Sequence, residues 1–214
     1  LNSWDLPKPG SNRGYPPAQL ILQALVSLWS GSAKFSHMDR IRLDPAVCEM
    51  FGWKRPAEHK AFLRLCSRFD QKSSTNFMRR AYRWVFKGAA LQGLTLDVDS
   101  SALTRWGRQI EGGKVGYNPR NRGRRSHHPL IALIAGVRLV ANMWLRPGDS
   151  NTANNITGFI EETLENVWPG KVGLFRADSG FWCSEVMNLL ESKGIHYIIS
   201  TRLTHAVQRE MVRS

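Results

Sequence analysis

The sequence predicts an α/β (α+β) fold in which a mixed β-sheet with flanking helices follows a helical N-terminal region. Two observations predict it. Up to about residue 90, apolar side chains recur at the three- and four-residue spacing of helices. Beyond Gly88, short apolar runs follow in the order strand, strand, strand, helix, strand, helix, strand. Antiparallel strands followed by strand–helix alternation are typical of a mixed sheet covered by helices. We therefore divide the 214-residue chain into residues 1–90 and 91–214.

Three helices are predicted in the first region. Pro16 and Pro17 precede the first, over residues 18–29, because proline is tolerated at a helix start. The second covers residues 58–69. Ser74 is the predicted cap of the third, since a serine side chain can accept a hydrogen bond from the first turn. The apolar stripe of this third helix consists of Phe77, Ala81, Trp84 and Val85.

The second region begins with a short strand at residues 94–98. Two apolar runs broken at Gly136 predict antiparallel strands joined by a tight turn. Helices ended by glycine or a Pro-Gly pair alternate with the last strands. The remaining predicted elements are strands at residues 129–135 and 137–145, a helix near 156–167, a strand at 171–176, a helix at 184–193 and a strand at 195–200.

The charge is strongly positive: 30 Lys and Arg against 17 Asp and Glu leave a net charge of +13 and a pI near 10.3. Residues 1–90 hold 15 basic and 6 acidic side chains, and residues 91–214 hold 15 and 11. Such an excess favours a polyanion, because neutralised phosphates release counterions. We therefore expect the helical, basic residues 1–90 to bind DNA. Hydrophobic residues at 42% exclude wholesale disorder. No apolar run approaches the roughly 20 residues of a membrane span.

Location and completeness are predicted from simple features. Three widely spaced cysteines without metal-binding spacing fit reduced thiols in a cytosol. No secretory signal opens the chain, so we expect a cytoplasmic protein. The start at Leu1 rather than a methionine suggests a fragment.

Acidic residues stand at predicted strand ends, where aspartate is disfavoured. Asp97 and Asp99 alternate with Leu96 and Val98, so their carboxylates point to one face of the strand. Asp178 follows another strand, at the end where sites of α/β proteins form. Mg²⁺ and Mn²⁺ prefer such oxygen ligands, and waters or substrate phosphates complete the coordination shell. These acids therefore suggest a divalent-metal site, although turn-capping roles for Asp99 and Asp178 explain the spacing equally well.

Residues 105–125 form an unusually long connection between the first two predicted strands. Glycines are interspersed through it, and Trp106 and Tyr117 are candidates for stacking on bases. A connection of this length usually has a function, and guanidinium groups grip phosphates in bidentate fashion. We interpret it as a DNA-binding loop. It holds one acid, Glu111, and seven basic residues: Arg105, Arg108, Lys114, Arg120, Arg122, Arg124 and Arg125.

Five sequence blocks, in this order, resemble the DDE-type transposases of bacterial insertion sequences, which have a ribonuclease H-like catalytic domain. The resemblance covers about residues 16–205 and extends to the basic helical N-terminal region. The blocks are Leu96-Asp97-Val98-Asp99-Ser100-Ser101, Gly116-Tyr117-Asn118-Pro119, Pro129-Leu130, Arg146-Pro147-Gly148 and Arg176-Ala177-Asp178-Ser179-Gly180-Phe181.

The resemblance implies a Mg²⁺- or Mn²⁺-dependent enzyme that cleaves DNA at the element ends and joins the freed 3′-OH to target DNA. Asp99 and Asp178 match the first two catalytic and metal-binding carboxylates, and Asp97 is interpreted as a supporting acid. The implied partner is double-stranded DNA, and the resemblance is compatible with a homodimer in the DNA complex. The implied location is the bacterial cytoplasm, on the nucleoid. The implied DNA contacts are Lys114, Arg120, Arg122, Arg124, Arg125 and Arg146.

The chain departs from the family at the third carboxylate, a helical Glu that in this group lies well beyond the last strand. Glu210, on a predicted helix at residues 204–213, is the last acid before Ser214. We interpret it as an ordinary helix acid. With two of three carboxylates, the chain is expected to be truncated at its C-terminus and inactive as it stands.

Three functional hypotheses stay open. The first is a transposase fragment, and the second is a catalytically inactive, transposase-derived protein that only binds DNA. The third is a different ribonuclease H-like nuclease that completes its site with Glu210.

Overall fold

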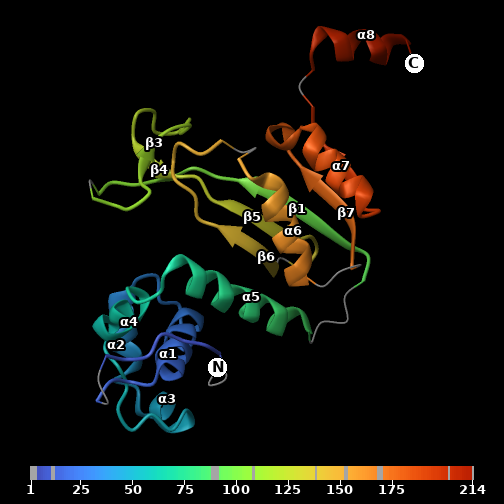
Figure 1. Cartoon of the computed structure of the whole chain (residues 1–214). Coiled ribbons are helices and arrows are strands. Elements are labelled where there is room, and N and C mark those ends of the chain that lie inside the picture. The colour runs from blue at the N-terminus through green and yellow to red at the C-terminus, as the bar shows by residue number, and fades with distance from the viewer. Residues whose placement is uncertain are drawn as a thin grey trace. The chain divides into compact units, whose positions relative to one another are not determined.

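The computed structural model describes residues 4–10, 13–87, 92–107, 109–137, 139–151, 154–167, 171–201 and 203–213, without the side chains of residues 206, 207 and 210. The chain divides into two compact units, Leu1–Ala81 and Tyr82–Ser214. Figure 1 shows helices throughout the first unit and a sheet in the second. The sequence-based division at residue 90 falls just after the helix that ends at Lys87.

The first unit is built from short helices around a small core. The predicted helices are present, and the segment between the first two also holds short helical turns that the sequence did not predict. Leu20, Ala57, Ala61 and Leu65 are buried together. The helices are α1 (Pro17–Trp29), η1 (Phe35–His37), α2 (Met38–Ile41), α3 (Pro45–Met50), α4 (His59–Cys66) and α5 (Gln71–Lys87).

A buried glutamine ties α1 to the segment before α4. Gln23 is fully buried; its Nε2 donates to the Ala57 carbonyl at 2.6 Å, and its Oε1 accepts from the Ala57 amide at 2.9 Å. Both backbone polar groups of the buried Ala57 are thereby hydrogen-bonded, to a side chain 34 residues away in the sequence. Nearby, the exposed Gln19 donates one bond to the Arg55 carbonyl.

We expect Gln23→Ala to lower the free energy of unfolding of this unit by at least about 2 kcal/mol, because two buried backbone groups lose their partners. Gln19→Ala, which removes one exposed bond, is the matched control and should cost less than about 1 kcal/mol. Urea unfolding followed by circular dichroism measures both. Equal, small losses would show that the buried contact does not hold the unit.

Two details of α5 differ from the sequence-based prediction. Asp70, not Ser74, caps it: the Ser73 amide donates to Asp70 Oδ1 at 2.7 Å, and the Asp70 amide donates to Ser73 Oγ at 3.0 Å. This reciprocal pair gives hydrogen-bond partners to two backbone amides at the start of the helix, which have none within the helix. The predicted apolar stripe is also wrong at Trp84 and Val85, which are 71% and 40% exposed; the buried side chains of α5 are Tyr82 and Phe86.

The second unit is a five-stranded mixed sheet in the order β6-β5-β1-β7-β8. β1 pairs antiparallel with β5 and parallel with β7. Helices α6 and α7 connect the later strands, so the α/β prediction of a mixed sheet with flanking helices is confirmed (Figure 1). The elements are β1 (Leu94–Ser100), β5 (Leu130–Ile134), β6 (Leu139–Trp144), α6 (Ile156–Val167), β7 (Val172–Ala177), α7 (Ser184–Ser192), β8 (His196–Ile199) and α8 (His205–Arg213).

Alternation along the strands gives the sheet two different faces. Leu96 of β1 pairs with Phe175 of β7, and both are fully buried. Phe159 of α6 and Val186 of α7 are also fully buried, as expected where helices cover this face. The residues between, including Asp97 and Asp99, therefore lie on the opposite face.

The connection predicted as an irregular loop at residues 105–125 forms part of a small second sheet in the order β2-β4-β3. Its strands contain only two or three residues, too few to leave an alternating pattern in the sequence. They are β2 (Leu103–Thr104), β3 (Lys114–Val115) and β4 (Arg125–His127). Arg108 lies outside the described residues.

None of the helices in the described part of the chain combines the length and apolar character needed to cross a membrane.

Candidate functional site

Asp99 and Asp178 lie at the ends of neighbouring parallel strands. In the β1–β7 ladder, Asp97 pairs with Arg176 and Val98 with Ala177, and Asp99 and Asp178 come directly after this last pair. Asp178 continues in extended conformation just past β7. Backbones of neighbouring strands are about 5 Å apart, and residues on one rung point to the same face. The register therefore brings the two predicted carboxylates together at the carboxyl ends of β1 and β7.

Each of the two carboxylates is oriented by a backbone amide and keeps one oxygen available for a hard cation. The amide of Ser100 donates to Asp99 Oδ1 at 2.7 Å, and the amide of Gly180 donates to Asp178 Oδ1 at 2.9 Å. These bonds orient each carboxylate at one oxygen. Within the described residues, no further hydrogen bond occupies Oδ2 of either group, and Asp99 is exposed. Two oriented oxygens at the ends of neighbouring strands fit Mg²⁺ or Mn²⁺, which take oxygen ligands and retain water.

A third acid of β1 is held by an ion pair. Arg176 donates from Nε to Asp97 Oδ1 at 2.6 Å and from Nη2 to Asp97 Oδ2 at 2.8 Å. This hydrogen bonding with Asp97 raises the pKa of Arg176. The bidentate geometry fixes the guanidinium beside Asp97. Asp97 and Arg176 each lie two residues before Asp99 and Asp178 along their strands. The only positive side chain on these rungs is thus bound to the acid that is not predicted to bind metal.

No group of three or more possible metal ligands occurs within the residues that the structure describes. The predicted helix at residues 204–213 is present as α8, but the side chain of Glu210 lies outside the described residues. The interpretation of Glu210 as an ordinary helix acid therefore stays a prediction.

The predicted DNA contacts of residues 105–125 gather on the small sheet. Arg120 and Arg122 are exposed and have no ion pair within the described chain. Arg124 lies over the exposed Trp106 ring, 5.1 Å from its centroid. The other two contacts have protein partners: Lys114 binds Asp149, and Arg125 donates to the Gly113 carbonyl.

The segment between β3 and β4 carries Arg120 and Arg122, and polar contacts hold this basic tip in place. Asn118 is 4% exposed, and its Nδ2 donates to Thr104 Oγ1 at 3.0 Å. Asn121 donates from Nδ2 to the same hydroxyl at 3.1 Å and from its amide to Asn118 Oδ1 at 3.2 Å. The basic tip is therefore anchored on β2, with its charged side chains directed to solvent.

Arg146 differs from the other predicted DNA contacts. It is 7% exposed, donates from Nε to the His128 carbonyl and from Nη1 to the Asn151 carbonyl, and burial lowers its pKa. This geometry favours a structural role, in which Arg146 links β6 to the chain near β4. A DNA contact by Arg146 stays a prediction.

Two glycines of the sequence blocks meet beside the small sheet. A Cβ added to Gly116 would lie 1.9 Å from the Gly148 carbonyl oxygen, and one added to Gly148 would lie 2.2 Å from that of Ser126. Neither contact leaves room for a side chain, because the neighbours are backbone atoms. The blocks around residues 116 and 148 are therefore packed against each other.

We expect Gly148→Ala to destabilise the second unit by about 1–3 kcal/mol, because a methyl group must displace backbone. Gly173→Ala in β7 is the control, since its Cβ would meet nothing closer than 3.8 Å. Thermal unfolding measures both variants, and faster amide exchange at Ser126 would locate the effect. Unchanged stability in Gly148→Ala would contradict the close packing.

His127 and His128 are adjacent in the sequence, but their rings contact different backbone carbonyls. His127 Nε2 contacts the Glu111 carbonyl, whereas His128 Nδ1 contacts the Ser150 carbonyl. Trp144 of β6 packs edge-on against Phe159 of α6. Sequence reasoning missed the Asp97–Arg176 pair, although both residues precede a predicted ligand by two positions.

Comparison with known proteins gives a family match over nearly the whole chain. The model of the family described as "Transposase DDE domain group 1" matches residues 5–214. No curated protein matches the sequence.

Solved structures resemble the chain at low sequence identity. The catalytic core domain of BIV integrase is 15% identical, with a TM-score of 0.34 over 56% of this chain and 63% of that one. The piggyBac transposase in a synaptic complex with hairpin DNA is 15% identical, with a TM-score of 0.47 over 92% and 43%. The Mos1 transposase in a paired-end complex with the left transposon end is 10% identical, with a TM-score of 0.36 over 96% and 73%. The chain thus spans less than two thirds of the integrase core.

Proposed function

Because the chain belongs to the family of transposase DDE domains, group 1, we propose that it is the catalytic part of a DNA transposase. The proposed reaction is metal-dependent strand cleavage at the element ends, followed by transfer of the freed end to target DNA. Asp99 and Asp178 are the proposed metal-binding catalytic carboxylates. The proposed location is the bacterial cytoplasm, on the nucleoid.

The observation that supports this proposal is the β1–β7 register, in which Val98 pairs with Ala177, and Asp99 and Asp178 each come next along the chain. Two carboxylates so close repel each other in a site without a cation. Asp99 and Asp178 are both exposed, as a site that takes a DNA strand requires.

Cleavage and joining are in-line displacements at phosphorus. In cleavage, the oxygen of water bonds to phosphorus while the bond to the 3′ oxygen breaks, which leaves a 3′-OH and a 5′-phosphate. In transfer, that 3′ oxygen bonds to a target phosphorus, and the target's own 3′ oxygen leaves. A bound Mg²⁺ or Mn²⁺ supplies charge neutralisation to the attacking and leaving oxygens. Asp99 and Asp178 would hold it, each oriented by a backbone amide at Oδ1.

The small sheet would hold the DNA backbone during these steps. Arg120 and Arg122 are the proposed phosphate contacts, because they are exposed and have no ion pair within the described residues. Tyr117, 73% exposed, and the Trp106–Arg124 stack lie on the same small sheet and offer flat surfaces to sugars or bases. Double-stranded DNA at the element ends and at the target is the proposed partner, and a homodimer would bring two ends together.

Cleavage of a supercoiled plasmid that carries the coding gene and its flanking DNA tests the proposal. The assay uses the product of the whole reading frame, because the third carboxylate is proposed to lie beyond Ser214 rather than at Glu210. Nicked or linear product is expected with Mg²⁺ and not with EDTA. A protein that binds this DNA in a salt-sensitive way but never cuts it would instead be the catalytically inactive relative.

A further inference from the structure

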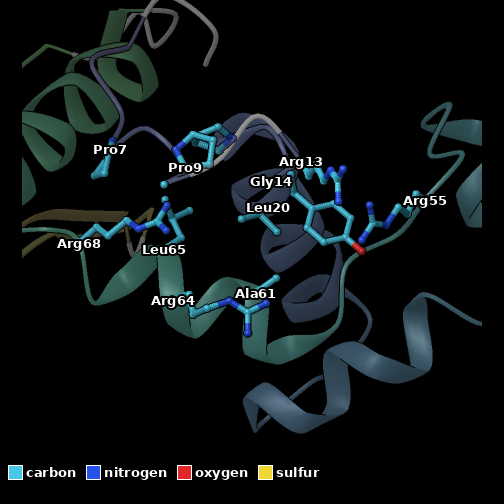
Figure 2. A pocket seen from close by; sticks show the side chains of 13 residues that line it. Pro7, Pro9, Arg13, Gly14, Leu20, Arg55, Ala61, Arg64, Leu65 and Arg68 are labelled. Atoms are coloured by element: carbon cyan, nitrogen blue, oxygen red, sulfur yellow. The ribbon is translucent and has the colours of Figure 1, made fainter.

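A basic pocket lies within the first unit, far in sequence from the carboxylates. It has a volume of about 420 Å³, within the range of small-ligand sites. We call it the arginine pocket, after the four arginines among its lining residues: Arg13, Arg55, Arg64 and Arg68. Figure 2 shows Arg55 and Arg68 at opposite ends of it, with Leu20 between them.

The charge in this pocket is uncompensated. None of its lining residues is acidic, and none of the four arginines forms an ion pair within the described part of the chain. Because all four side chains carry positive charge around one cavity, their electrostatic potential favours a bound anion. Because guanidinium matches phosphate geometry, phosphate is the anion that this arrangement suits.

Two of the arginines are held in place by distant parts of the unit. Arg68 Nη1 donates to the Lys8 carbonyl at 3.0 Å, across 60 residues of sequence. The guanidinium of Arg55 lies 4.8 Å from the centre of the Tyr15 ring. The segment that follows Arg55 is fastened to α1 by the buried Gln23. The pocket is therefore largely formed before any ligand arrives, which lowers the entropic cost of binding.

The floor of the pocket is apolar. Leu20, Ala61 and Leu65, each at most 5% exposed, belong to the core of the unit and also line the cavity. A duplex backbone offers only phosphates and sugars to a concave site of this kind, whereas an unpaired nucleotide offers a phosphate together with a flat apolar base. A rim of arginines over an apolar floor matches the second arrangement.

We infer that the arginine pocket binds an unpaired nucleotide of a DNA strand, with its phosphates on the arginines and its base against the half-buried prolines of the lining, Pro7, Pro9 and Pro17. The inference rests on the proposed function, because it takes DNA to be the partner. It adds a second DNA site, which requires neither metal nor Asp99 and Asp178. A strand end opened during transposition would supply such a nucleotide.

Fluorescence anisotropy of the 214-residue chain in EDTA tests this site with a labelled thymidine strand about six nucleotides long. The test variant is Arg13→Ala with Arg64→Ala, since neither side chain has a hydrogen bond or ion pair within the described residues. The control is Arg40→Ala with Lys60→Ala, which removes the same charge from exposed positions outside the lining. Circular dichroism verifies that both variants fold.

We expect the test variant to bind the thymidine strand at least about fivefold more weakly than the control, and to bind blunt duplex as the control does. Wild type should also bind an abasic strand of the same length at least about fivefold more weakly than the thymidine strand. Equal losses in test and control variants would overturn the inference, as would an equal loss on duplex or full affinity for the abasic strand. Because no cleavage is measured, such a failure leaves the plasmid assay as an independent test of the transposase proposal.

Discussion

Replacing Asp99 or Asp178 by Asn is expected to weaken Mn²⁺ binding by the 214-residue chain at least about tenfold, and the double variant should bind none at this site. Each substitution removes one of the two proposed anionic ligands, while the amide keeps the size of the side chain. Outer-shell partners alone typically contribute about 10- to 100-fold to metal affinity, so a direct ligand should contribute at least as much. Isothermal titration calorimetry measures the change.

Glu161→Gln is the matched control, because Glu161 is an exposed acid of α6 with no hydrogen bond or ion pair within the described residues. It removes the same charge and should leave Mn²⁺ binding unchanged. In the product of the whole reading frame, the same Asp99 and Asp178 substitutions should lower plasmid cleavage at least about 100-fold. Cleavage by either variant at the wild-type rate would refute the catalytic role of that carboxylate.

The second large effect is expected at Asp97. Asp97→Asn breaks the bidentate pair with Arg176 and leaves a guanidinium free to approach Asp99 and Asp178. We expect Mn²⁺ affinity to fall about 10- to 100-fold, although Asp97 itself is not a proposed ligand. Adding Arg176→Gln to this variant removes the competing cation and should restore most of the lost affinity.

The double variant separates this effect from simple unfolding. If Asp97 only stabilises the sheet, the double variant should bind metal as weakly as Asp97→Asn, and Arg176→Gln alone should be equally weak. If Asp97 keeps Arg176 away from the carboxylates, Arg176→Gln alone should bind metal at least as well as wild type. Urea unfolding of all three variants verifies that each is folded during the titration.

Much of the sheet could be predicted from the sequence because its strands are long enough to leave a pattern. The runs that became β5 and β6 are apolar and interrupted at Gly136, whose φ of 82° suits the tight turn between them. The helix predicted near residues 156–167 has those same bounds in α6. By contrast, β2, β3 and β4 depend on pairing between distant segments, and strands of two or three residues carry no such signal.

The candidate site was only partly predictable for the same reason. Alternation along one strand places Asp97 and Asp99 on one face, but only the parallel register, in which Val98 pairs with Ala177, shows that Asp178 follows its strand at the same end of the sheet as Asp99. The Asp97–Arg176 pair spans 79 residues. The arginine pocket is drawn from three separated segments, so no local pattern marks it. Arg146 shows the reverse: a basic residue in a recognisable block is buried against backbone carbonyls.

The most direct test of the metal site is anomalous diffraction from crystals of the chain grown with Mn²⁺. The account predicts one strong anomalous peak at the carboxyl ends of β1 and β7, within about 2.3 Å of an oxygen of Asp99 and of Asp178. The account would be contradicted by Mn²⁺ bound at high occupancy elsewhere and not at these residues. It would also be contradicted if the side chains of Asp99 and Asp178 pointed away from each other with no peak between them.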